Sequence, residues 1–278
     1  ISNGRYIRRD SQFRDWVTAD GSSSFKAESG RYHLHIAINC PWAHRTRIFR
    51  TLKRLKNVIS MSIVLPRRTD QGWVFDNDDP HYRDHCVGTH ALHEVYSLAQ
   101  PDYSGSVTVP TLWDTERRTI VNNESSEIIR MLNSEFQACT DDKTDYYPEP
   151  LRKEIDALNA VIYPTVNNGV YRAGFASTQD AYEKACPGVF ATLDQLEERL
   201  AAPRYLLGDQ LTEADWRLFP TLGRFDVAYY GAFKCNVRRI VDYPNLWDYT
   251  RELRQMPGIA ETVDIELFKR GYDSPTPM

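Results

Sequence analysis

The 278-residue sequence lacks a C-x-x-C pair, and its five cysteines stand singly at positions 40, 86, 139, 186 and 235. An odd number of cysteines cannot close completely into internal disulfides, and without a close second cysteine there is no dithiol redox motif. The pattern argues against a disulfide-stapled secreted fold and is typical of a reducing compartment. In such a compartment most cysteines are small apolar core residues.

Long apolar runs and an excess of positive charge are also missing. No stretch approaches the ~20 apolar residues needed to span a bilayer, and residues 1–16 have no apolar block like that of a signal peptide. A formal net charge of −4 gives little general attraction for phosphate polymers. We expect a cytoplasmic protein with neither membrane nor nucleic acid as partner, although a chain that begins at Ile1 rather than Met leaves a removed leader open.

What is present indicates a folded chain of about two domains. Its length exceeds the roughly 100–200 residues of a typical domain, and 41% hydrophobic with 26% charged residues is ordinary for a globular protein. Residues 32–38 alternate with the period of a strand, and the apolar residues after Pro41 recur at helical spacing. Residues 58–65 are β-branched and apolar enough for a second strand, so the opening predicts a β-α-β unit.

The remainder of the first half is less regular. Residues 66 to about 105 form a polar insertion with one expected helix in LHEVYSLA. The segments SVTVPTLWD and RTIV predict a β-hairpin, and NNESSEIIRMLN predicts a helix that closes this half.

The second half has the pattern of an all-helical domain. Helical periodicity runs through four segments: 151–162, 179–200, 212–225 and 244–255. Thr212 lies three residues before Asp215, a spacing that indicates a capping box at the start of a helix. A polar, acidic stretch at 137–150 separates the halves. The predicted domains are 1–136, with a core of about 31–136, a linker at 137–150, and a helical domain with a C-terminal tail at 151–278.

Cys40 lies where the first predicted strand gives way to the first predicted helix, in NCPWAHRT. At a helix N-terminus, free amides and the macrodipole favour an anion. Proline suits the first helical position because the amide hydrogen it lacks would go unpaired. Such a position lowers the pKa of a cysteine thiol and makes it a nucleophile. The alternative is an inert cysteine at a turn.

The residue three positions after Cys40 is Ala43, where a dithiol oxidoreductase would have its resolving cysteine. A mixed disulfide on Cys40 would therefore need a thiol from solution, and glutathione is the abundant intracellular one. The chemistry implied is monothiol exchange.

Eight motifs occur in order along nearly the whole chain: CPWAHRT, GWVF, VTVPTLWD, NNESSEIIRMLN, NNGVYRAGFA, LTEADWRLF, RFDVAYYGAFKC and QMPGIAETV. Together they resemble the glutathionyl-hydroquinone reductases, also called Xi-class glutathione transferases. CPWA combined with GVYRAGFA and the late FKC is specific to that group, whereas Val-Pro followed by Glu-Ser occurs across glutathione transferases.

The resemblance implies an α/β plus all-α architecture: a thioredoxin-like N-terminal domain, an all-helical glutathione-transferase C-terminal domain, and a homodimer. It also implies a reaction without a metal, in which a glutathionyl-hydroquinone and the co-substrate glutathione give a hydroquinone and glutathione disulfide. Cys40 matches the family nucleophile. It would become S-glutathionylated before a second glutathione releases it.

Glutathione-binding residues are implied in the same way. Val109, before a family cis-proline at Pro110, would pair its backbone with the cysteinyl part of glutathione, and Glu124 and Ser125 would hold the γ-glutamyl group. Trp73 matches a residue beside glutathione. From the residues alone, Val-Pro is a strand-ending turn, Glu-Ser caps a helix and a lone tryptophan is a core residue.

Tyr171 in GVYRAGF and Tyr272 in RGY match the family tyrosines that bind the hydroquinone hydroxyls. Phenols suit this task, because carbon–sulfur cleavage needs a proton for the ring and stabilisation of its oxygens. With 16 tyrosines in the chain, a structural role is the alternative. Two departures concern contacts with the ligands: Ser106 replaces the usual family arginine, and the end GYDSPTPM lacks the family's longer extension.

Two further patterns allow other interpretations. Residues 81–93 concentrate zinc-binding residue types, but in a polar insertion with uncertain register, which makes a metal site the weaker hypothesis; they are His81, His85, Cys86, His90 and His93. The basic run 45–56 would suit nucleic acid, but its interspersed apolar residues indicate a solvated helix face.

Two alternative functions stay open at this point. An omega-like thiol transferase or dehydroascorbate reductase would use the same monothiol chemistry on smaller or protein-bound acceptors. A non-catalytic binding or assembly subunit with the glutathione-transferase fold would keep Cys40 buried.

Overall fold

The computed structural model describes residues 3–272, which form two compact units. The sheet unit comprises residues 9–145, and the helical unit comprises residues 3–8 together with 146–272. The predicted C-terminal tail lies beyond residue 272 and so outside the described residues. Between residues 3 and 272, no helix combines the length and the apolar character that crossing a membrane requires.

A four-stranded sheet in the order β4-β3-β5-β6 forms the centre of the sheet unit. β3 (Tyr32–Ile36) pairs in parallel with β4 (Ser60–Ile63), and α1 (Pro41–Leu52) connects them, so the predicted β-α-β unit is confirmed. β5 (Thr111–Asp114) and β6 (Thr119–Asn122) form the predicted antiparallel hairpin, and β5 pairs antiparallel with β3.

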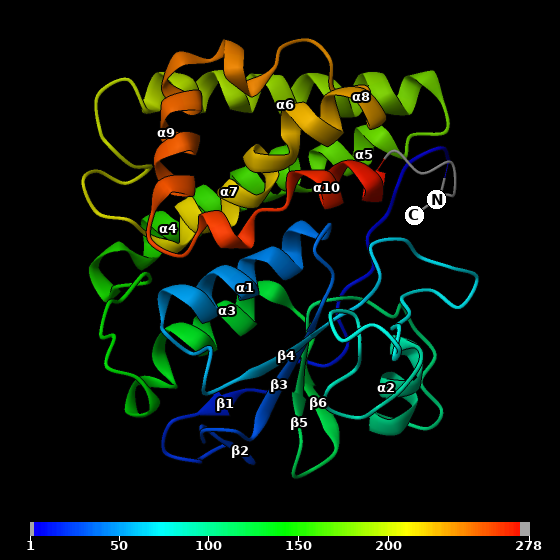
Figure 1. Ribbon diagram of the computed structural model, residues 1–278. Coiled ribbons are helices and arrows are strands. Elements are labelled where there is room, and N and C mark those ends of the chain that lie inside the picture. Colours follow the sequence, from blue (N-terminus) through cyan, green and yellow to red (C-terminus); the bar gives the residue numbers. More distant parts are fainter. Residues whose placement is uncertain (1–2, 273–278) are drawn as a thin grey trace. The chain divides into compact units, whose positions relative to one another are not determined.

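Two longer helices complete this unit. α3 (Ser125–Ser134) lies beside α1 along the sheet, and α2 (Leu92–Ala99) packs near β6 on the other side (Figure 1). Both helices were predicted. A short parallel pair, β1 (Val17–Thr18) with β2 (Phe25–Lys26), was not predicted, because two-residue strands leave no periodic pattern in a sequence.

The four predicted helices of the second half are present in the helical unit: α4 (Arg152–Ile162), α6 (Gln179–Arg199), α7 (Glu213–Arg224) and α9 (Pro244–Gln255). The sequence pattern missed three other helices and two π-helical segments: α5 (Gly169–Gly174), α8 (Tyr230–Ala232), α10 (Ile265–Tyr272), η3 (Tyr163–Asn167) and η4 (Phe225–Tyr229). Short 3₁₀ turns are η1 (Gln137–Cys139), η2 (Glu149–Leu151), η5 (Ile240–Asp242) and η6 (Ala260–Thr262).

Asp215 anchors the start of α7. Its carboxylate accepts a hydrogen bond from the Thr212 backbone N–H at 2.8 Å, which is the predicted capping interaction. It also accepts from the Leu206 backbone N–H at 3.0 Å and from the Tyr249 hydroxyl at 2.9 Å. Asp215 is fully buried, and burial raises its pKa even though these donors act in the opposite direction. One side chain thus holds α7, α9 and the loop before α7 together.

The N-terminal arm belongs to the helical unit. The Gly4 carbonyl accepts a hydrogen bond from the Ser177 N–H at 3.0 Å, and the Tyr6 ring packs on Phe175 with centroids 5.2 Å apart. Residues 3–8 therefore fold with the segment that joins α5 to α6.

Candidate active site

Cys40 is the N-cap residue of α1, with Pro41 as the first helical residue. Its sulfur accepts a hydrogen bond from the Ala43 N–H at 3.5 Å and donates one to the Val109 carbonyl at 3.5 Å. The residue is partly exposed, and the first turn of α1 carries no acidic side chain that would offset the helix dipole. The helix start and the Ala43 N–H suit a thiolate, the hydrogen bond to the Val109 carbonyl suits the protonated thiol, and the sulfur stays partly accessible.

Val109 precedes Pro110 through a cis peptide bond, as the family resemblance implies. Val109 is buried beside Cys40, in the loop that enters β5. No described residue accepts a hydrogen bond from its backbone N–H. The segment therefore offers a backbone donor to a partner outside the chain.

Glu124 and Ser125 meet at the start of α3. Glu124 is the N-cap and accepts hydrogen bonds from the Ser126 N–H at 3.0 Å and the Ser126 hydroxyl at 2.9 Å. This is the helix-capping role that the residues alone indicated. Ser125 is buried, and its hydroxyl lies 3.4 Å from a guanidinium nitrogen of Arg45. The helix start and the Arg45 guanidinium suit a carboxylate, while the carboxylates of Glu124 and Glu127 in the same turn suit an ammonium group.

Arg45 corrects the interpretation of the basic run 45–56 as a solvated face. Arg45 is 2% exposed and Lys53 is 0% exposed. Buried charges require partners. The Lys53 ammonium binds the Thr144 carbonyl and lies 3.1 Å from an Asp142 carboxylate oxygen, while Arg45 reaches Ser125. The sequence pattern misled because both cations bind partners that are remote in sequence, Ser125 for Arg45 and Asp142 for Lys53.

Trp73 lies in the insertion between β4 and β5, and it is partly exposed rather than a core residue. Its carbonyl accepts a hydrogen bond from the Leu92 N–H at 2.8 Å, and the Arg68 guanidinium lies 5.6 Å from its ring centroid. Ser106, which replaces the family arginine, is exposed, and its carbonyl accepts from the Tyr103 hydroxyl at 2.9 Å.

Three tyrosine hydroxyls meet in the helical unit. Tyr171 of α5 and Tyr272 at the end of α10 have hydroxyls 2.5 Å apart, and Tyr229 of η4 lies 3.4 Å from the first and 3.3 Å from the second. All three side chains are buried, and burial raises the pKa of Tyr272 well above its ordinary value. Each phenol can donate one hydrogen bond and accept others, so the three form a compact donor cluster.

Tyr171 and Tyr272 were predicted from the sequence as site residues, but Tyr229 was not. Tyr229 lies within RFDVAYYGAFKC, yet no spacing rule separates it from the adjacent Tyr230. Phe233 of the same motif stacks on the Tyr229 ring at 5.2 Å and meets the Tyr171 ring edge-on at 5.0 Å. A Cβ at Gly174 would lie 2.2 Å from Phe233, so only glycine allows this wall to close.

The residues that could hold a metal ion in the structure are not the ones that the sequence suggested. Among the described residues, the group that could hold a metal is His33, His35 and Asp84, not the cluster at 81–93. Both His33 nitrogens already contact serine hydroxyls, of Ser60 at 2.6 Å and Ser62 at 2.9 Å.

Asp84 accepts a hydrogen bond from the Thr89 hydroxyl at 2.8 Å and lies 3.4 Å from the His35 Nε2. The His35–Asp84 contact joins β3 to the insertion, while the other His35 ring nitrogen, Nδ1, is buried without a hydrogen-bond partner among the described residues.

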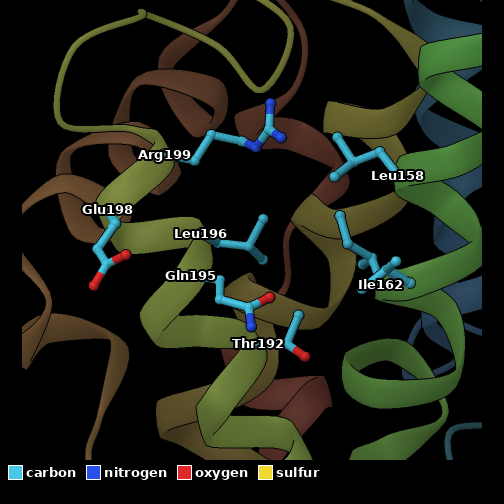
Figure 2. A pocket seen from close by; sticks show the side chains of 8 residues that line it. Leu158, Ile162, Thr192, Gln195, Leu196, Glu198 and Arg199 are labelled. Carbon is cyan, nitrogen blue, oxygen red and sulfur yellow. The ribbon is translucent and has the colours of Figure 1, made fainter.

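A groove between α4 and α6 has a volume of about 470 Å³. Figure 2 shows Leu158 and Ile162 of α4 facing Thr192 and Leu196 of α6 across it. Its lining contains none of the residues that the sequence assigned to catalysis or glutathione binding.

Two family models match the chain: the glutathione S-transferase N-terminal domain over residues 39–135 and the glutathione S-transferase C-terminal domain over residues 179–252. With a cysteine at the first helix of the sheet unit, this is the organisation of a glutathione transferase. The predicted fold class, a thioredoxin-like domain followed by an all-helical domain, is confirmed.

Similarity to individual proteins shows to which class of glutathione transferases the chain belongs. The chain is 50% identical to the glutathionyl-hydroquinone reductase YqjG of Escherichia coli over 278 residues, covering 98% of this chain and 85% of that protein. A solved glutathione-bound structure of YqjG matches with a TM-score of 0.91 at 50% identity, covering 94% of this chain and 87% of that one.

The chain is 49% identical to the glutathionyl-hydroquinone reductase PcpF of Sphingobium chlorophenolicum over 271 residues, with 98% and 85% covered. The Xi glutathione transferase structure of Phanerochaete chrysosporium matches with a TM-score of 0.93 at 46% identity, covering 96% and 92%. The chain belongs to the Xi-class glutathione transferases, the family of the glutathionyl-hydroquinone reductases.

Proposed function

We propose that the protein reduces glutathionyl-hydroquinones to hydroquinones with glutathione as co-substrate. The observation that carries this proposal is Cys40 at the N-terminus of α1, partly exposed and contacted by the Ala43 N–H and the Val109 carbonyl. The names of the relatives YqjG and PcpF support the same activity.

In the first step the Cys40 thiolate attacks the glutathionyl sulfur of the substrate. The new bond is the disulfide between Cys40 and glutathione, and the bond that breaks joins that sulfur to the hydroquinone ring. The bonding electron pair leaves with the ring carbon, which takes up a proton to give the free hydroquinone. The Ala43 N–H donates to the Cys40 sulfur and so stabilises it as an anion before the attack.

In the second step a free glutathione attacks the mixed disulfide. Its sulfur joins the bound glutathione as glutathione disulfide, and Cys40 leaves as a thiolate. Ala43 in place of a second cysteine supports this external resolution, because no thiol on α1 competes with glutathione. Both steps balance without a metal or another cofactor.

Glutathione would bind along the residues assigned by the resemblance. The unpartnered N–H of Val109, next to Pro110, suits the cysteinyl backbone of glutathione, in the manner of an added strand. The start of α3, with Glu124 and Ser125, suits the γ-glutamyl amine and carboxylate, and Trp73 would cover the peptide. The glutathione-bound YqjG structure supports such a site.

The tyrosine cluster would serve the hydroquinone. Tyr171 and Tyr272 would donate hydrogen bonds to the ring hydroxyls and supply the proton that the ring carbon takes up. Tyr229, in hydrogen-bond distance of both, would donate its own hydroxyl hydrogen to one of them and so leave their hydrogens for the substrate. We further propose a homodimer that works in the cytoplasm, where glutathione is abundant.

The experiment that tests this function is turnover of glutathionyl-benzohydroquinone by the wild type and Cys40→Ser. We expect the variant to lose at least about 10³-fold in kcat, because the hydroxyl is not ionised at neutral pH. Cys86→Ser is the matched control, since Cys86 is also partly exposed but burial raises its pKa to about 12. Full activity in Cys40→Ser would refute the assignment.

The same assay distinguishes the alternatives. An omega-like thiol transferase would turn over a small glutathione mixed disulfide or dehydroascorbate faster than the glutathionyl-hydroquinone. A non-catalytic binding subunit would turn over none of them, and its Cys40 would resist glutathionylation.

A further inference from the structure

The helical unit contains a cavity of about 340 Å³ that none of the proposed catalytic or glutathione-binding residues lines. We name it the α7–α9 pocket; its lining includes Leu222, Gly223, Val227, Ile240, Trp247 and Arg254. The volume is within the range of small-molecule sites, about 300–1,000 Å³. η4 turns Val227 toward this pocket and Tyr229 into the hydroxyl cluster, so the two sites share one backbone segment.

One face of α9 lines the pocket. Trp247, Arg251 and Arg254 follow each other at helical spacings of four and three residues, so they form one stripe. The core of the unit is contacted by a different stripe, with Leu246, Tyr249 and Leu253 buried. Trp247 is 36% exposed at the pocket, whereas an ordinary core tryptophan such as Trp216 is fully buried. An aromatic ring beside two guanidinium groups is therefore held at the surface without serving the core.

The charges of the pocket favour an anion. Arg251 pairs with Asp248 at 3.4 Å, and Arg254 has no ion-pair partner within residues 3–272. The acid of the lining, Asp226, is tied to the backbone: it accepts from the Ile240 N–H at 2.6 Å and the Val241 N–H at 3.1 Å. The Asp226 carboxylate thus fixes the backbone at Ile240, which lines the pocket. The guanidinium of Arg254 therefore stays available to a ligand.

We propose that the α7–α9 pocket binds a planar aromatic anion, a carboxylate or sulfonate. Its ring lies on Trp247 against the apolar wall of Val227 and Ile240, and its anionic group faces Arg254 and Arg251. This site is independent of the proposed reaction, because none of these residues takes part in it.

Gly223 provides the decisive variant. A Cβ added there meets no atom within 4 Å, and Gly223 lines the pocket, so we expect Gly223→Leu to place its side chain in the pocket. Leucine also favours the helical conformation of α7 over glycine. Gly188→Leu is the matched control, since Gly188 lies in α6 outside the pocket and its Cβ also meets nothing within 4 Å.

The probe is 2-naphthalenesulfonate, titrated into protein labelled with 5-fluorotryptophan and followed by ¹⁹F NMR. The chain has six tryptophans, and Trp247→Phe identifies the Trp247 signal. We expect a saturable shift of that signal in the wild type and in Gly188→Leu, and binding at least about tenfold weaker in Gly223→Leu. A Trp247 signal that does not move, or equal binding by Gly223→Leu and Gly188→Leu, overturns the proposal.

A second arm tests the charge and does not depend on the Gly223 variant folding. Arg254→Gln should weaken 2-naphthalenesulfonate binding about two- to fivefold, the worth of one exposed ion pair. Arg238→Gln, on an exposed arginine outside the pocket, should leave it unchanged. Neutral 2-methylnaphthalene should bind more weakly than the sulfonate. Equal binding of the two probes, or no effect of Arg254→Gln, contradicts an anion site.

Discussion

The thiol region of the sheet unit and the hydroxyl cluster of the helical unit are built in different ways. Cys40 and Glu124 each occupy the residue before a helix, and Val109 lies just before a strand. Local backbone geometry places all three. The hydroxyls of Tyr171, Tyr229 and Tyr272 meet only because residues 43 to 101 positions apart are brought together by three separate segments.

Because of this difference, substitutions near Cys40 and substitutions that affect the tyrosine cluster should have different consequences. The helix start that carries Cys40 supplies its own amides, so substitutions there should change reactivity while the fold stays intact. The tyrosine cluster requires α5, η4 and α10 to pack correctly, so substitutions in distant anchors such as Asp215 should disturb it through stability. Four predictions sharpen this contrast.

Asp215→Ala should give the largest loss, about 3 kcal/mol of unfolding free energy or more, because four buried donors lose their acceptor. Urea unfolding followed by circular dichroism measures it. Asp180→Ala is the control: Asp180 is also in the first turn of a helix but is exposed, and its loss should cost less than about 0.5 kcal/mol. Equal effects of the two variants would contradict the anchoring role.

Tyr272→Phe should lower kcat for glutathionyl-benzohydroquinone about 10²-fold, the effect of removing one donor to a developing charge. Tyr171→Phe should match it, because the two hydroxyls share the 2.5 Å contact. Reduction of a small glutathione mixed disulfide, which has no ring hydroxyls, should stay within about twofold of wild type, since kcat for it depends on Cys40 alone. If kcat falls equally for both substrates, the thiol region and the hydroxyl cluster do not have separate functions.

Acid should destabilise the protein through His33. Burial, mainly, lowers the pKa of His33 to about 2, well below the roughly 6.5 of an unfolded histidine. As the pH falls below about 6.5 the unfolded chain takes up the proton first, so stability is lost: about 2 kcal/mol between pH 6.5 and pH 5.

Urea unfolding at pH 7 and pH 5 checks this for the wild type, His33→Gln and the exposed His81→Gln. We expect the pH dependence to shrink only in His33→Gln. The same pH dependence in all three proteins would show that His33 is not the titrating group.

Tyr229→Phe should have the smallest effect, about threefold in kcat, because its hydroxyl lies 3.3 and 3.4 Å from the other two and contributes one long hydrogen bond. Steady-state kinetics on glutathionyl-benzohydroquinone gives the value. A loss as large as that of Tyr272→Phe would make Tyr229 an equal member of the donor set.

The contrast also explains what the sequence could predict. Period and capping rules located α1, the hairpin and the four long helices, because each is a local pattern. They could not locate α10 or η4, whose form depends on packing, nor the burial of Arg45 and Lys53, whose partners are remote in sequence. Tyr171 and Tyr272 were predicted from family resemblance, and Tyr229 and Asp84 emerged only from the fold.

The central claim is that Cys40 carries the glutathionyl group between the two half-reactions. Intact-protein mass spectrometry after mixing with glutathionyl-benzohydroquinone, without free glutathione, tests it most directly. We expect one added glutathione, mapped to Cys40 and removed by free glutathione with release of glutathione disulfide. Hydroquinone formation with Cys40 unmodified throughout, or an adduct on another cysteine, would contradict it.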